Sequence, residues 1–182
     1  MTAFEFVFPL FGLLVGLTYT EMLSGLARAL KSNRHVRIGW LVPLLGVLVL
    51  INLTMFWYGA WQMRDLAMPT SGTLLMTLLV GGTYYLAASL VFPNAEDDVP
   101  DLDDHFIRTR RKSLLAIAFC NLLGLALVAS NAGWAMAPLW WGVNATFLLV
   151  LVVAAYANNR RLVVGLLLLM IGFHGLGVLL GR

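Results

Sequence analysis

The sequence predicts an all-α fold, a bundle of six transmembrane helices. Hydrophobic residues make up 60% of the 182 residues and charged residues only 12%, which is more apolar surface than a water-soluble domain of this size can bury. The apolar residues form six long runs, and about 20 such residues in a helix cross a hydrocarbon core of roughly 30 Å. The runs are continuously apolar and rich in leucine, and they do not alternate at a period of two, so a β-barrel is not expected.

The expected spans fill a single transmembrane domain. In order they are 6–29, 38–61, 74–92, 113–130, 139–156 and 162–180. The first is not expected to be a cleaved signal peptide, because it lacks a basic start and its apolar part is too long. Among the connectors, only 93–112 is long enough to fold locally. It is an acidic stretch followed by a basic one.

Basic residues predict the orientation of these spans. Ten of the twelve lysines and arginines flank the first, third and fifth connectors, namely Arg28, Lys31, Arg34, Arg37, Arg108, Arg110, Arg111, Lys112, Arg160 and Arg161. The other two, Arg64 and Arg182, fall on the opposite side. Because basic connectors stay in the cytoplasm in bacterial-type insertion, we expect a multi-pass inner (plasma) membrane protein with both termini outside. The formal charge of +3 then reflects topology, and no nucleic-acid partner is expected.

Five of the six tryptophans gather near the outer ends of the second and fifth spans and are expected to form an aromatic belt. They are Trp57, Trp61, Trp134, Trp140 and Trp141. In the fourth span Cys120 is interpreted as a small buried hydrophobic residue, and as the single cysteine it forms no disulfide within the chain.

Three spans precede the long connector and three follow it. This division raises the hypothesis of two three-helix halves related as an inverted repeat. The best internal match pairs residues 78–86 with residues 168–176 at a constant offset of 90. The same offset does not align the first and fourth spans without a large gap. Both a repeat and a chance match of leucine-rich segments therefore stay open.

Each span carries a polar side chain near its centre. At a rise of about 1.5 Å per residue, these residues fall in one layer near the bilayer midplane: Glu21, Asn52, Tyr84 or Tyr85, Asn121, Asn144 and His174. Polar groups in hydrocarbon are costly and normally face the bundle or water. The layer indicates either a hydrated path through the protein or hydrogen bonds between helices, and for the asparagines we favour the hydrogen bonds.

Glu21 differs from the asparagines, because a carboxylate at this depth must be protonated, paired or hydrated. Arg28 lies two helical turns nearer the cytoplasm on the same face, so a stretched ion pair with Glu21 is one expectation. The other is a proton or cation site at Glu21, with His174 as a second titrating group of a relay.

Small residues recur at steps of four in the first and last spans, where they let helices approach closely. They are Gly12, Gly16, Thr20 and Ser24 in the first span, and Gly177 and Gly181 in the last. This stripe indicates helix packing, either inside the monomer or between subunits of an oligomer.

The connector 93–112 contains the only candidate metal ligands. Asp97, Asp98 and Asp101 spell DDxxD, a pattern that holds magnesium diphosphate in prenyl-transferring enzymes, but Pro100 interrupts it and no second motif is present. A nonspecific or regulatory divalent-cation site formed by Asp101, Asp103, Asp104 and His105 is a second alternative. The remaining interpretation is an acidic linker followed by a basic segment that meets anionic lipid head groups.

Three functions remain open. The first is a small channel-like or transporter-like protein whose path passes Glu21 and the midplane layer. The second is a non-catalytic accessory or scaffold subunit of a larger membrane complex, and the third is a lipid-modifying enzyme that uses the acidic connector. The sequence contains no HExxH, GxSxG or Walker motif, so enzyme activity is the less favoured expectation and no cofactor is expected. The expected partners are the lipid bilayer and either further copies of the chain or other membrane subunits.

Overall fold

The protein is described by a computed structural model covering residues 3–31, 37, 39–62, 64, 70–93, 101–132 and 138–179. This part of the chain forms six α-helices: α1 (Ala3–Lys31), α2 (Leu41–Gln62), α3 (Ser71–Ser89), α4 (Leu102–Ala132), α5 (Pro138–Tyr156) and α6 (Arg160–Leu179). The predicted all-α fold is confirmed, and each helix overlaps one of the expected spans.

Four segments of the described chain are long and apolar enough to cross a membrane, as expected of a helical membrane protein. They are Phe8–Lys31, Leu41–Gln62, Leu102–Ala129 and Pro138–Tyr156. The apolar part of α3, Leu74–Ser89, is shorter. Many large apolar side chains lie on the outside of the bundle, including Leu13, Leu75 and Leu149, each more than 60% exposed. This distribution suits a protein whose outer surface contacts lipid.

The helix that contains the fourth expected span begins about three turns before the span, at Leu102 and not near residue 113. Asp101 caps this helix: its Oδ1 accepts the Asp103 N–H at 2.8 Å, and its carbonyl accepts the His105 N–H at 3.3 Å. Asp103 and Asp104 add negative charge beside the positive end of the helix dipole. The polar residues 102–112 therefore extend the membrane helix and do not form a linker.

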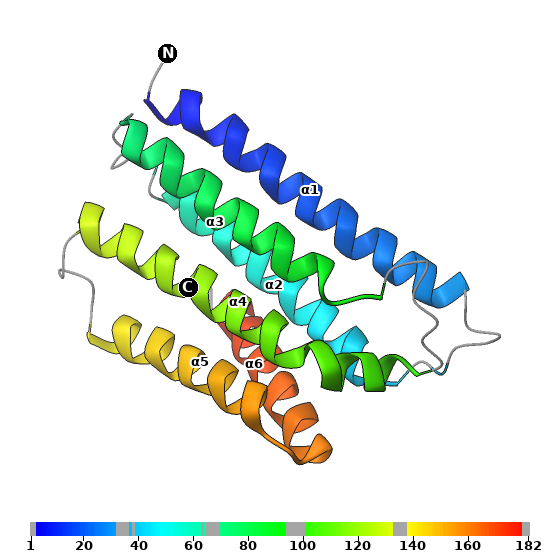
Figure 1. The fold of residues 1–182 in the computed structure, drawn as a ribbon. Coiled ribbons are helices and arrows are strands. Elements are labelled where there is room, and N and C mark those ends of the chain that lie inside the picture. Colours follow the sequence, from blue (N-terminus) through cyan, green and yellow to red (C-terminus); the bar gives the residue numbers. More distant parts are fainter. Residues whose placement is uncertain are drawn as a thin grey trace.

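The helices form two layers (Figure 1). In one layer α1, α3, α4 and α5 lie side by side in that order, and α2 and α6 pack on each other behind it. The back layer joins the front one where α2 packs on α1 and α4 and where α6 packs on α5. Eight residues of α2 are buried where it packs on α1, α4 and α6.

Glycines allow close helix contacts in the front layer. A Cβ added at Gly81 of α3 would lie 2.8 Å from the Cβ of Leu14 on α1. A side chain at Gly25 of α1 would meet the ring of Phe92, which follows α3. The α1–α3 contact thus depends on two residues outside the predicted small-residue stripe.

The two three-helix halves are packed differently. In the first half, α1 lies directly against α3, whereas α4 and α6, their counterparts in a repeat, pack on other helices. The internal match between residues 78–86 and 168–176 is therefore not accompanied by a repeated arrangement of helices in the described part of the chain.

Candidate functional site

The polar residues of the predicted midplane layer do not all contact one another. Asn52, Tyr84 and Asn121 come together between α2, α3 and α4. Glu21 lies apart from them on α1, where it contacts Arg28. Asn144 and His174 each bond to their own helix.

Asn52 and Asn121 join α2 to α4 through their side chains. The Asn121 Nδ2 donates to the Asn52 Oδ1 at 3.3 Å and also to the Ile117 carbonyl at 2.8 Å. Asn52 is only 4% exposed. These contacts match the predicted interhelical hydrogen bonding.

Tyr84 lies beside this pair on α3 and is 1% exposed. Its ring packs against Phe56 of α2 with centroids 5.7 Å apart. Its hydroxyl has no hydrogen-bond partner of good geometry among the described residues, although the side chains of Cys120 and Asn121 are near enough to interact with it. Cys120 is fully buried, as expected for a packing residue. Tyr85, the alternative to Tyr84 in the layer, is 37% exposed and lies outside the group.

Glu21 and Arg28 form the stretched ion pair that their spacing predicts. The Arg28 Nη2 lies 3.5 Å from the Glu21 Oε1, and the side chains are 42% and 28% exposed respectively. Thr18, Met22 and Gly25, on the buried side of α1, face the bundle. The ion pair therefore lies at the edge of the outer face of α1, within a segment apolar enough to span a membrane.

The polar groups of α5 and α6 do not form a relay with Glu21. The Asn144 Nδ2 donates to the Trp140 carbonyl at 2.9 Å, and the His174 Nδ1 lies 2.9 Å from the Met170 carbonyl. The His174 ring meets the Phe147 ring edge to face at 5.0 Å. His174 thus packs on α5, and α1 and α6 are not neighbouring helices in the bundle.

A polar contact between α1 and α2 was not predicted from the sequence. The Tyr19 hydroxyl bonds to Thr54 Oγ1 and lies 3.3 Å from the Leu50 carbonyl, to which Thr54 also donates at 2.8 Å. Tyr19 and Thr54 both lie inside expected spans, so the sequence could have identified them as polar residues within the membrane helices. It could not have predicted that they pair, because the pairing depends on the relative rotation of α1 and α2.

The residues of the small-residue stripe on α1 do not all face the same surroundings. Gly12 faces Trp57 of α2, where an added Cβ would lie 2.9 Å from the ring. Gly16 has nothing within 4 Å of such a Cβ, and Thr20 is exposed and donates to the Gly16 carbonyl at 2.9 Å. Ser24 is partly exposed. The middle of the stripe therefore lies on the outer face of α1, while Gly181 and the surroundings of Gly177 lie outside what the structure describes.

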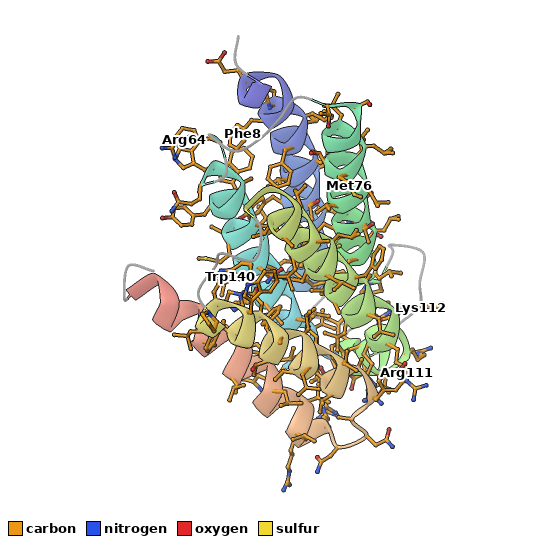
Figure 2. All side chains as sticks on the ribbon, turned by 90° about the vertical axis from the view of Figure 1, so that its left-hand side faces the viewer. Phe8, Arg64, Met76, Arg111, Lys112 and Trp140 are labelled. Atoms are coloured by element: carbon orange, nitrogen blue, oxygen red, sulfur yellow. The ribbon has the colours of Figure 1, made fainter. Side chains whose placement is uncertain are left out.

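Four of the five tryptophans expected to form an aromatic belt lie in two separate ring clusters. Trp57 and Trp61 of α2 pack around Phe8 of α1, with centroid distances of 4.4 and 6.1 Å, and Trp140 and Trp141 of α5 meet edge to face at 5.0 Å. Trp134 lies outside the described residues. Phe8 and Arg64 lie at one end of the bundle, and Arg111 and Lys112 lie toward the other end (Figure 2).

Asp103 joins three helices at the end where Arg111 lies. It is 0% exposed, its Oδ1 accepts the Leu41 N–H at the start of α2 at 2.9 Å, and its Oδ2 forms an ion pair with Arg160 at the start of α6. The Leu102 N–H donates to the Arg37 carbonyl at 3.1 Å, which ties the same end to the segment before α2. The sequence indicated acidic residues here but not that one of them is buried.

The four candidate metal ligands point in different directions. The Asp103 carboxylate accepts the Leu41 N–H and pairs with Arg160. The His105 Nε2 lies 3.4 Å from the Leu90 carbonyl, and Asp104 is exposed. Asp101 caps α4. No group of three histidine, cysteine or acidic side chains with metal-binding geometry occurs in the residues described. Asp97 and Asp98 lie outside those residues, so the DDxxD interpretation stays a prediction without structural support.

The fold and these contacts define an all-helical protein with several helices of membrane-spanning length. Comparison of the chain with protein-family models, curated proteins and solved structures finds no match. Its function is therefore argued from the contacts above.

Proposed function

We propose that the chain crosses a bacterial-type inner membrane six times, with both termini outside the cytoplasm. The separation of Arg111 and Lys112 from Arg64 at opposite ends of the bundle supports this orientation (Figure 2). Single cysteines in a Cys120→Ser background test it. A membrane-impermeant thiol reagent applied to intact cells should label a cysteine at Gln62 and not one at Asn159. The reverse pattern would contradict the orientation.

We propose further that the protein is a non-catalytic accessory or scaffold subunit that associates with other membrane helices through the outer face of α1. We define this face by Gly16, Thr20, Glu21, Ser24 and Arg28. The Glu21–Arg28 ion pair carries the proposal, because it lies partly exposed on the outside of an apolar helix. An ionisable group inside a bilayer costs at least ~2.5 kcal/mol on insertion scales, so such groups rarely face lipid.

A neighbouring helix would remove this cost. The ion pair would then be shielded from hydrocarbon, and the open space at Gly16 would let the two backbones approach closely. By contrast, the other midplane groups are already used within the bundle: Asn52 bonds to Asn121, and Asn144 and His174 bond to their own helices. Among these contacts, the Asn52–Asn121 bond holds two helices together.

Crosslinking in native membranes tests this role. In the Cys120→Ser background, Gly16→Cys should give disulfide-linked or reagent-linked products, either with a second copy or with another membrane protein. Leu149→Cys, on the exposed surface of α5, is the control and should not crosslink. Glu21→Gln and Arg28→Gln should each reduce the product at Gly16→Cys. Equal crosslinking from Leu149→Cys, or a lone monomer after mild extraction, would overturn the proposal.

A second candidate function is transport along a path past Glu21 and the midplane group. The buried Tyr84 hydroxyl favours it, because this hydroxyl has no hydrogen bond of good geometry among the described residues and could contact a passing ion or proton donor. Flux measurements in liposomes separate the two functions. The transport function predicts that Glu21→Gln or His174→Ala changes an ion or proton flux, and unchanged flux in both variants would exclude this path.

A further inference from the structure

The first three turns of α4 contact the end of α5, the α5–α6 connector and the start of α6 through three pairs of side chains. Asp103 pairs with Arg160, the Arg110 Nη2 donates to the Asn158 Oδ1 at 3.3 Å, and the Arg111 guanidinium lies 5.2 Å from the centre of the Tyr156 ring. These contacts run in antiparallel order, so the beginning of α4 lies along the end of α5 and the start of α6.

Two basic side chains at this junction, Arg110 and Arg160, form the hydrogen bond and the ion pair described above. Arg110 is buried at 8% exposure and Arg160 pairs with Asp103. Arg108, Arg111 and Lys112 are exposed on one face of α4, because residues three and four apart share a helix face. Arg161 is exposed at the start of α6. Asp104 is the one exposed carboxylate on the face of α4 that carries Arg108, Arg111 and Lys112. With Arg161 added, the junction is strongly positive.

The junction lies at the boundary of the apolar part of the bundle. Tyr156 is the last residue of α5, and tyrosine is typical of the membrane–water interface. The apolar residues of α4 begin directly after Lys112, and those of α6 begin at Leu162. Along α4, the exposed side chains of Phe119 and Leu122 continue this surface toward the middle of the helix.

We propose that this junction binds one anionic phospholipid, with its phosphate between Arg111 and Arg161 and an acyl chain along Phe119 and Leu122. An arginine fork suits phosphate oxygens, and the Tyr156 ring restricts Arg111 before the lipid arrives. The ligand is a lipid and not a free anion, because the basic groups adjoin an exposed apolar surface that fits an acyl chain.

The site would join α4 to α6 across the membrane surface. Asp103 and Arg160 already connect these helices on the buried side of the junction, and the lipid phosphate would connect them on the exposed side. This inference does not depend on the proposed scaffold function, since it concerns residues of α4, α5 and α6, whereas α1 packs on α2 and α3.

The test uses the full chain in phosphatidylcholine nanodiscs with increasing phosphatidylglycerol, with thermal unfolding and native mass spectrometry as readouts. Phosphatidylglycerol should raise the unfolding temperature of the parent and remain bound to it. Arg111→Gln with Arg161→Gln should weaken lipid binding by about 30-fold, since each of the two basic groups beside the phosphate contributes about fivefold. Lys31→Gln with Arg37→Gln removes the same charge from the same end of the bundle and should weaken it by no more than about threefold.

Tyr156→Ala is a second variant that leaves the charge unchanged. It should weaken phosphatidylglycerol binding several-fold, because the ring that orients Arg111 is lost. Unfolding in phosphatidylcholine alone establishes that each variant is folded. Equal losses in the Arg111/Arg161 and Lys31/Arg37 variants would overturn the site. So would the same stabilisation by inorganic phosphate in phosphatidylcholine discs, which would mark an anion site without lipid specificity.

Discussion

Gly39 has no side chain where Asp103 needs the space. A Cβ at this position would overlap the Asp103 carboxylate, which is held in place by the Leu41 N–H and by Arg160. The residue therefore has a steric role, and the buried acid depends on it.

We predict that Gly39→Ala lowers the free energy of unfolding by about 2 kcal/mol or more, because the carboxylate must move away from its partners. Gly165→Ala on α6 is the control. Its added methyl meets open space, and alanine favours a helix over glycine by about 0.5–1 kcal/mol. Unfolding of both variants in mixed micelles measures the difference. Equal stability of the two would contradict the steric role of Gly39.

Asn52 and Asn121 provide a second residue-scale prediction. Replacing either asparagine by leucine should destabilise the protein, and the double replacement should cost less than the sum of the two. The coupling energy should be about 0.6 kcal/mol and at most about 1.7 kcal/mol, as for other hydrogen bonds between membrane helices. A double-mutant cycle measures it. Asn144→Leu should show no coupling to Asn52→Leu, because its amide bonds to its own helix.

At the scale of a single element, α4 combines two environments in one continuous helix. Its later turns pack between α3 and α5, and its first turns reach α2 and α6 through Asp103. The charged residues of these turns were expected to form a linker, but the Asp101 cap and the acids of the first turn are compatible with a helix. Capping residues could therefore have indicated the start of α4 from the sequence.

The ion pair at the start of α4 should be asymmetric in its energetics. Arg160→Gln leaves the buried Asp103 carboxylate without its cation and should destabilise the protein by about 2 kcal/mol. This value is below that for a fully buried pair, since the Arg160 side chain is 54% exposed. Asp103→Asn with Arg160→Gln should recover part of the loss, because the buried charge is removed and an acceptor for the Leu41 N–H is kept. Denaturant unfolding measures both, and a double variant less stable than Arg160→Gln would contradict this account.

At the scale of the whole molecule, the two halves of the chain depend on each other. α4 packs on α3 and α2, and α2 packs on α6, so the contacts that enclose α2 come from both halves. Neither half contains the complete surroundings of its own buried residues.

We predict that residues 1–96 and 97–182, expressed together as separate chains, associate into one complex, and that each half expressed alone is degraded or aggregates. Affinity purification through a tag on one half measures the association. A symmetric repeat predicts instead that each half forms a stable homodimer by taking the place of the other. A folded homodimer of residues 1–96 would therefore contradict the packing described here.

The sequence by itself determined the helical class, the approximate extent of five of the six helices and the presence of polar residues in their apolar parts. These follow from local hydrophobicity and helix length, which act along the chain and can be measured in the sequence. It also indicated the Glu21–Arg28 pair, because residues seven apart lie on one face of one helix.

Only the tertiary structure decided which polar groups meet across helices. The Asn52–Asn121, Tyr19–Thr54 and Asp103–Arg160 contacts each join residues more than 30 positions apart. Such pairs depend on helix order and on the rotation of each helix about its axis, which small differences in packing energy select and composition does not reveal. For this reason the sequence predicted the polar residues of the midplane layer but not that Asn52 and Asn121 bond to each other while Asn144 and His174 bond to their own helices.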